Sequence, residues 1–171
     1  MSFVAPHIDY AGLSPVIALT AGICVVLLAG VIGRGSGRWI STTLTAVAIA
    51  TTAGLLIWQL GEPDRDLVEG ALRIDGLSIV ATLICLAAAA MALPAFLRDP
   101  APEEGGFAET HALLLGSLLG MTMLAQSINL ISFFVALELL SIPLYALCGT
   151  NPRRRESLES GLKYLLSLIH I

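Results

Sequence analysis

The fold is decided by residues 110–151, which read THALLLGSLLGMTMLAQSINLISFFVALELLSIPLYALCGTN. Across these 42 residues the only Asp, Glu, Lys or Arg is Glu138. A bilayer core about 30 Å thick needs about 20 apolar residues per helix, so this stretch is too long for one span. Residues 126–129, QSIN, supply turn chemistry and polar side chains at an interface, and they divide the stretch into predicted spans at 110–125 and 130–149.

Three further uncharged stretches precede this one. They cover residues 13–33, 39–60 and 76–97, and each is 21 or 22 residues long. Beyond the fifth stretch, a sixth helix is predicted to begin near Ser157 and to cover 157–165. The sequence therefore predicts an all-α fold, a polytopic transmembrane helix bundle that forms a single membrane domain over 1–171. It has five complete spans and the start of a sixth.

Composition supports the same class and excludes others. Hydrophobic residues make up 56% of the 171, with 9 basic and 13 acidic residues, so lipid must cover most of the surface. The net charge of −4 and the lack of a long basic tract argue against a nucleic-acid partner. No disulfide framework or metal site is encoded, because the three cysteines stand alone in apolar runs. We expect them to be small core residues: Cys24, Cys85 and Cys148.

The basic residues of the short loops predict that the N-terminus lies outside. In that orientation the outer segments hold only Arg65 and Arg73. The cytoplasmic segments hold six arginines, at positions 34, 38, 98, 153, 154 and 155.

Glu138 is the residue that breaks the apolar pattern. It lies roughly 12 Å into its span, close to the middle of the membrane, where an ionised group costs several kcal/mol, on the order of 3 on insertion scales. Ser141 and Tyr145, three and seven residues later, share its helical face. Pro143 cannot donate to the carbonyl of Leu139, so a kink and a free backbone acceptor are expected beside the carboxylate.

Two interpretations of Glu138 stay open at this point. It is either a neutral, hydrogen-bonded packing residue or a relay carboxylate for protons or ions. Lys163 is either a second proton-transfer group or an interfacial lysine paired with Glu159, four residues earlier. His111, at the mouth of its span, is either an interfacial histidine or a residue of proton entry.

These residues carry a resemblance to a known family. Residues 137–147, LELLSIPLYAL, resemble the fifth-helix signature of subunit N of respiratory complex I, the proton-pumping NADH-quinone oxidoreductase. Residues 111–121 resemble its fourth helix, 161–164 the start of its sixth, and 73–76 the lead into its third. The sister subunits L and M and the multisubunit sodium/proton antiporters share a carboxylate at the position of Glu138, but the residues around Glu138 favour subunit N.

The resemblance implies an antiporter-like subunit in the bacterial inner membrane, a multi-pass protein whose partners are the lipid bilayer and other membrane subunits of complex I. It implies no cofactor or metal in this chain, because NADH, FMN, iron-sulfur clusters and quinone belong to other parts of the complex. In the family a carboxylate on helix five pairs with a lysine on helix seven, and a lysine on helix six belongs to the same network. Glu138 matches the first and Lys163 the last, while the helix-seven lysine has no counterpart here.

Two other functions remain alternatives: a subunit of a multisubunit cation/proton antiporter, or a structural membrane scaffold. The resemblance also implies that the chain is an N-terminal fragment, not expected to be active alone. Residues 166–171, LSLIHI, resemble a translated sequencing-adapter end, so we expect a truncated gene product.

Overall fold

The computed structural model describes residues 8–32, 37–98, 106–150 and 155–169. In these ranges the helices are α1 (Ser14–Ile32), α2 (Gly37–Gln59), α3 (Gly76–Phe96), α5 (Phe107–Gln126), α6 (Leu130–Cys148) and α7 (Arg155–Ile169). Five of them are long and apolar enough to cross a membrane: α1, α2, α3, α5 and α6. The predicted all-α membrane bundle is therefore confirmed. The helix predicted over 110–125 begins three residues earlier, at Phe107.

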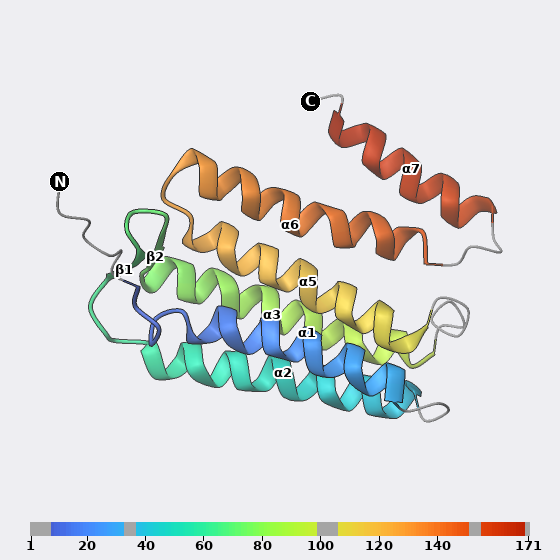
Figure 1. Cartoon of the computed structure of the whole chain (residues 1–171), viewed down its shortest axis with the longest axis horizontal. Helices are drawn as coiled ribbons and strands as arrows, with labels where there is room; N and C mark the ends of the chain where they lie inside the picture. The colour runs from blue at the N-terminus through green and yellow to red at the C-terminus, as the bar shows by residue number, and fades with distance from the viewer. Residues whose placement is uncertain (1–7, 33–36, 99–105, 151–154, 170–171) are drawn as a thin grey trace.

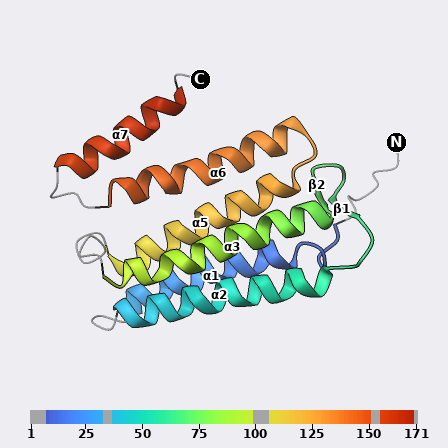
Figure 2. The same ribbon diagram turned by 180° about the vertical axis from the view of Figure 1, so that it is seen from behind.

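Helix α5 is the centre of the bundle. It packs against α1, α2, α3 and α6. Among the described helices, α6 makes substantial contact only with α5 and α7. Figures 1 and 2 show the result: α1, α2, α3 and α5 form one group, α6 covers one side of α5, and α7 lies beyond α6. The α6 helix thus has one face on the bundle and much of its remaining surface uncovered.

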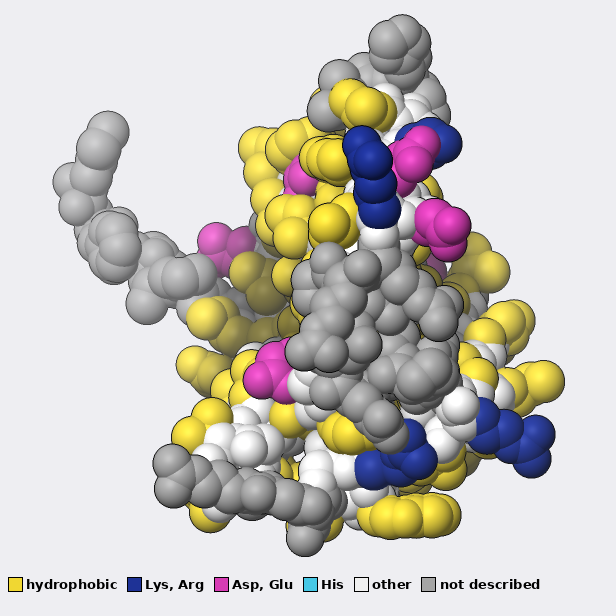
Figure 3. All heavy atoms as spheres, turned by 90° about the vertical axis from the view of Figure 1, so that its right-hand side faces the viewer, with side chains coloured by type: hydrophobic (Ala, Val, Ile, Leu, Met, Phe, Trp, Pro, Cys, Tyr) yellow, Lys and Arg dark blue, Asp and Glu magenta, His cyan; other side chains and the backbone are white. Residues whose placement is uncertain are grey.

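The burial pattern is that of a protein surrounded by lipid. The core contains fully buried leucines such as Leu19, Leu56 and Leu115. Large apolar side chains are nevertheless exposed along the helices, and Met91 and Leu130 are both 81% exposed. Figure 3 shows hydrophobic side chains on both flanks of the molecule. A surface of this kind suits hydrocarbon rather than water.

The cysteines depart from the sequence prediction. Cys24 and Cys148 are exposed and Cys85 is half-buried, so the expectation that all three are core residues is wrong. The reason is that apolar runs in a membrane helix supply both the core face and the lipid face. Hydropathy alone does not separate the two faces.

A short antiparallel hairpin joins α2 to α3, a feature that the sequence analysis did not predict. Strand β1 (Arg65–Val68) pairs with β2 (Leu72–Ile74). The turn places Glu69 and Gly70 at φ 27° and 76°, a left-handed conformation that is easy for glycine and strained for glutamate. The Ser132 hydroxyl donates to the carbonyl of Ala71 at 2.7 Å. The hairpin therefore ties the α2–α3 connection to the start of α6.

Helix α3 begins with a reciprocal cap that gives a first prediction. Asp75 Oδ1 accepts from the Ser78 backbone N–H at 2.7 Å, and Ser78 Oγ accepts from the Asp75 N–H at 3.0 Å. Asp75→Ala should lower the free energy of unfolding by about 1 kcal/mol, because the backbone N–H of Ser78 then loses its acceptor. Asp75→Asn, which keeps an acceptor oxygen, should cost much less. Unfolding in mixed micelles with increasing SDS measures both, and an alanine variant as stable as the wild type would refute the cap.

Candidate functional site

Glu138 lies near the middle of α6, on the face turned away from α5. Residues Ala136 and Pro143 of α6 are buried, while Glu138 is half-buried. At 3.6 residues per turn, Glu138 shares its face with residues four and seven positions away, and we call this set the Glu138 face. Its exposed apolar members are 78%, 61% and 58% exposed, respectively: Ile131, Phe134 and Ile142. The described helices therefore leave most of the Glu138 face uncovered.

The Glu138 carboxylate has neither a hydrogen bond nor an ion pair within the described part of the chain. Ser141 is buried, but its hydroxyl donates to the Leu137 carbonyl at 2.7 Å rather than to the carboxylate. Of the polar stripe predicted from the sequence, Tyr145 lies on the Glu138 face, whereas Ser141 is buried beside it and makes no bond to the carboxylate.

Tyr145 extends the Glu138 face toward α7. Its ring meets the ring of Tyr164 edge to face, with centroids 5.3 Å apart and planes at 68°. Farther along, the Ser157 hydroxyl donates to the carbonyl of Cys148 at 2.8 Å. Contacts at the end of α6 therefore hold α7, and they place Tyr164 beside a residue that the sequence analysis had selected.

Glycines of α5 set the position of the α6 backbone beside Glu138. A Cβ atom at Gly120 would lie 2.5 Å from the Leu140 Cα and 2.8 Å from the Leu139 carbonyl carbon. At Gly116, one turn earlier, it would lie 3.3 Å from Cγ of Pro143. Small residues spaced four apart allow membrane helices to approach this closely. The close approach begins one residue after the carboxylate.

The structure does not bring Lys163 to Glu138. The Lys163 Nζ lies 2.7 Å from Oε1 of Glu159, one turn earlier on α7. Both side chains are largely exposed, at 72% and 59%. Of the two interpretations left open by the sequence, this geometry matches the local ion pair. Any contact between Lys163 and Glu138 would require α7 or the Lys163 side chain to move.

His111 lies one turn from the start of α5, as its predicted position at the mouth of the span requires, and neighbouring helices bury its side chain. It is 1% exposed and lies among α2, α3 and α5, far from the Glu138 face. Its Nε2 is 3.1 Å from the Thr42 hydroxyl, and its ring lies 5.6 Å from the ring of Phe96. His111 and Glu138 thus occupy opposite sides of α5.

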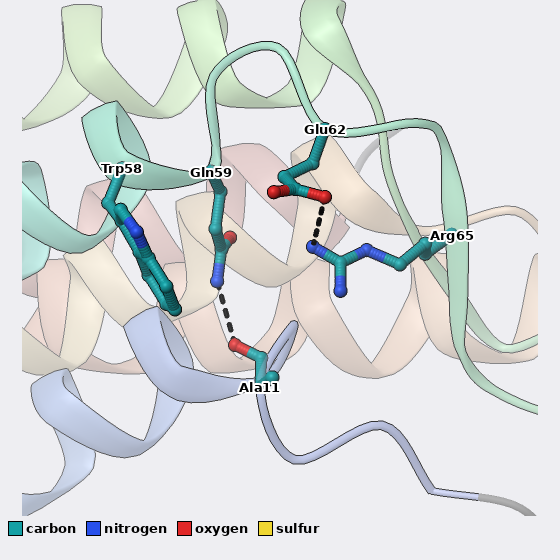
Figure 4. Close-up of a pocket in the computed structure, with 5 residues that line it drawn as sticks. All are labelled: Ala11, Trp58, Gln59, Glu62 and Arg65. Atoms are coloured by element: carbon teal, nitrogen blue, oxygen red, sulfur yellow. Dashed lines mark hydrogen bonds and ion pairs between the residues drawn. The ribbon is translucent and has the colours of Figure 1, made fainter.

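A small cavity lies at the end of the bundle that carries the hairpin (Figure 4). Its volume is about 80 Å³, and its lining includes Gln59, Glu62 and Arg65. The Gln59 amide nitrogen donates to the Ala11 carbonyl at 2.7 Å, and Arg65 pairs with Asp9 at 3.6 Å. Its charges are therefore already largely compensated, and the residues that the structure describes contain no cluster of His, Cys, Asp and Glu that could hold a metal ion.

Comparison with known proteins adds independent evidence. Residues 127–169 match the family described as NADH:quinone oxidoreductase/Mrp antiporter, TM. NADH-quinone oxidoreductase subunit N from Cutibacterium acnes is 33% identical over 97% of this chain, and the corresponding subunit N 1 of Koribacter versatilis is 32% identical over 92%. The chain belongs to the subunit N family of NADH-quinone oxidoreductases. It spans about a third of the length of these relatives, 36% and 33% respectively.

The structural comparison agrees. A chain of respiratory complex I from Thermus thermophilus, solved with bound aureothin, superposes with a TM-score of 0.71 and is 31% identical. The superposition covers 89% of this chain and 32% of that one. The predicted location, a multi-pass protein of the bacterial inner membrane, is supported by these relatives. The family match over 127–169 includes Glu138, Pro143 and Lys163.

Sequence reasoning selected Glu138 but missed the residues that position it. The spacing of Gly116 and Gly120 was available as a signal, because two glycines four apart in an apolar helix favour a close helix contact. Tyr164 and Thr42 gave no such signal. Their partners lie 19 and 69 residues away in the chain.

Proposed function

We propose that this chain forms part of an antiporter-like, non-redox membrane subunit of a proton-translocating NADH-quinone oxidoreductase, assembled with other membrane subunits. Within it, Glu138 takes up and releases protons inside the membrane. The observation that carries this proposal is a mid-helix carboxylate without a partner in the described chain, on a face otherwise lined by exposed apolar residues. NADH, flavin, iron-sulfur clusters and quinone would act elsewhere in the complex.

The charge of Glu138 is costly inside a membrane. An ionised carboxylate facing hydrocarbon near mid-membrane costs on the order of 3 kcal/mol or more. Glu138 is therefore expected to meet protein or water in the assembled subunit, and a cationic partner is the group that would stabilise its charged form. When such a partner moves away, the carboxylate gains affinity for a proton.

The magnitude is adequate for pumping. Moving one proton against about 150 mV takes about 3.5 kcal/mol, which equals roughly a 300-fold change in proton affinity. An opposite charge that approaches and leaves a carboxylate changes its proton affinity by about 10-fold to 1000-fold. Tyr145 on the Glu138 face and the buried Ser141, three residues after Glu138, are accessory candidates. Lys163 is a secondary candidate because Glu159 already pairs with it.

A cation/proton antiporter subunit remains the second candidate, because the description of the matching family names both kinds of protein. Affinity purification of the tagged protein from native membranes separates the two. The proposal expects the tagged protein to co-purify with NADH-oxidising activity. It also expects the genes for the other oxidoreductase subunits to lie beside the source gene. A sodium-stimulated antiport activity without NADH oxidation would support the alternative and overturn the proposal.

The predicted orientation gives a prediction of its own. In a background with the three natural cysteines replaced by alanine, Asp9→Cys and Asp66→Cys should react with an impermeant thiol reagent added from outside. Gly35→Cys and Glu104→Cys, which lie outside the described residues, should react only after the membrane is opened. The physical reason is that arginine-rich short loops are retained on the cytoplasmic side. Labelling of the opposite pair would reverse the assignment.

A further inference from the structure

We infer that His111 is a second proton-binding site of this chain, separate from Glu138, and that the hydroxyl of Thr42 completes it. The inference stands on the geometry of four groups at one end of the bundle. Its role in proton uptake, as opposed to proton binding, rests on the proposed function.

The four groups are the Phe107 carbonyl, the His111 ring, the Thr42 hydroxyl and the Arg38 carbonyl. They form a chain of short contacts with a hydrogen-bond acceptor at each end. The His111 Nδ1 lies 2.7 Å from the Phe107 carbonyl oxygen, and its Nε2 lies 3.1 Å from the Thr42 Oγ1. The Thr42 hydroxyl in turn lies 2.9 Å from the Arg38 carbonyl oxygen, to which it can donate. Both carbonyl oxygens can only accept hydrogen bonds.

Counting hydrogen atoms shows that the chain is one proton short when His111 is neutral. Three contacts then share two hydrogens, one on the ring and one on the Thr42 hydroxyl. If Nδ1 carries the ring hydrogen, the Thr42 hydroxyl serves either His111 or Arg38 but not both. If Nε2 carries it, two lone pairs face each other between Nδ1 and the Phe107 carbonyl oxygen.

An imidazolium fills all three contacts at once. The Nδ1–H donates to the Phe107 carbonyl, the Nε2–H donates to the Thr42 Oγ1, and the Thr42 hydroxyl donates to the Arg38 carbonyl. In this step one N–H bond forms at Nε2, and one bond to hydrogen breaks in the donor, a hydronium ion of the adjoining aqueous phase. The hydrogen of Thr42 only rotates.

The surroundings make the bound proton releasable. Burial opposes the charge, because His111 is 1% exposed, while two acceptor oxygens favour it. On the helices that surround His111, the charged side chains described at this end are Arg38 on α2, the exposed Arg98 after α3, and the exposed Glu109 on α5; α7, which packs on α6, begins at the same end with the exposed Arg155 and Glu156. The Arg38 guanidinium lies over the ring of Phe107, 5.2 Å from the ring centre, and Phe107 is one helical turn before His111.

The location suits exchange with one aqueous side. His111 is the fifth residue of α5, roughly 6 Å along the axis from the helix start. With the N-terminus outside, this end of the bundle faces the cytoplasm. His111 would then receive protons from the side opposite the hairpin.

Nitrogen NMR of the chain in lipid nanodiscs tests this inference without any assay of pumping. The histidines are labelled with ¹⁵N, and the His111 signals are identified by their loss in His111→Gln. Between pH 8 and pH 5 we expect the ring to pass from neutral to imidazolium, with both nitrogens protonated. Thr42→Val should require about tenfold more acid for the same change, because an acceptor of the Nε2–H is lost.

Thr42→Ser is the matched control and should titrate like the wild type, because it keeps the hydroxyl. A His111 ring that stays in one neutral tautomer over this range would overturn the inference, and the wild-type spectra alone decide this even if Thr42→Val does not fold. An unchanged midpoint in a folded Thr42→Val would overturn the part played by Thr42. A negative result here leaves the Glu138 experiments unaffected, so the two proposals fail separately.

Discussion

Replacing Gly120 with leucine is expected to break the packing of α5 against α6. One Cα hydrogen of Gly120 faces backbone atoms of Leu139 and Leu140. A Cβ in its place would lie 2.5 Å from the Leu140 Cα. Backbone cannot move aside as a flexible side chain can, so α6 must shift as a whole. We expect Gly120→Ala to cost about 1–3 kcal/mol and Gly120→Leu more than that, measured by unfolding in mixed micelles.

Two other glycines provide the controls. Gly54, in the last third of α2, has open space around it, so Gly54→Ala should be neutral or slightly stabilising through helix propensity. Gly116→Ala should be intermediate, because its Cβ would meet the side chain of Pro143 at 3.3 Å. Equal stability of Gly120→Ala and Gly54→Ala would show that the close approach of α5 and α6 is not required.

Glu138→Ala is expected to harm proton transport far more than assembly. Removal of a carboxylate from a half-buried site near mid-membrane should ease insertion, because the cost of placing an ionisable group there disappears. Proton transfer through this site should fall at least about hundredfold, since no other titratable group in the described chain is bonded to the carboxylate and could replace it. The measurements are the amount of assembled complex in membranes and the proton transport that it supports.

Conservative variants sharpen this prediction. Glu138→Asp keeps a carboxylate at shorter reach and should retain part of the transport, whereas Glu138→Gln keeps the shape without the titration and should behave like alanine. Lys163→Ala should be milder, because Lys163 is 72% exposed and paired with Glu159. If Lys163→Ala is as damaging as Glu138→Ala, α7 must move toward Glu138 during the reaction.

The spans could be predicted from the sequence because the membrane imposes one simple rule on them. About 20 uncharged residues are needed for each span, and charges therefore mark the gaps. The β1–β2 hairpin escaped this reasoning, since its strands have only four and three residues. The sequence carried only faint signals of the hairpin. They are the apolar residues Leu67, Leu72 and Ile74, which the structure buries, and Gly70, which follows Glu69 at the turn.

The candidate site was predictable only in part, for a related reason. A single carboxylate in an apolar run identifies Glu138 directly, because its cost in a membrane is high. The face on which it lies depends on which neighbour α6 packs against, and that is determined by Gly116 and Gly120 of α5. The contact of His111 with Thr42 could not be predicted, because Thr42 lies 69 residues earlier and a single sequence gives no pairing information over that separation.

Redox-driven proton uptake by inverted membrane vesicles tests most directly whether Glu138 carries protons. NADH is added to vesicles that contain the complete complex, and the initial rate of proton uptake is divided by the amount of assembled complex. With Glu138→Ala we predict normal assembly and a lower number of protons moved per NADH oxidised, with partial recovery in Glu138→Asp. Unchanged proton uptake by normally assembled Glu138→Ala would contradict the account and leave Glu138 a packing residue only.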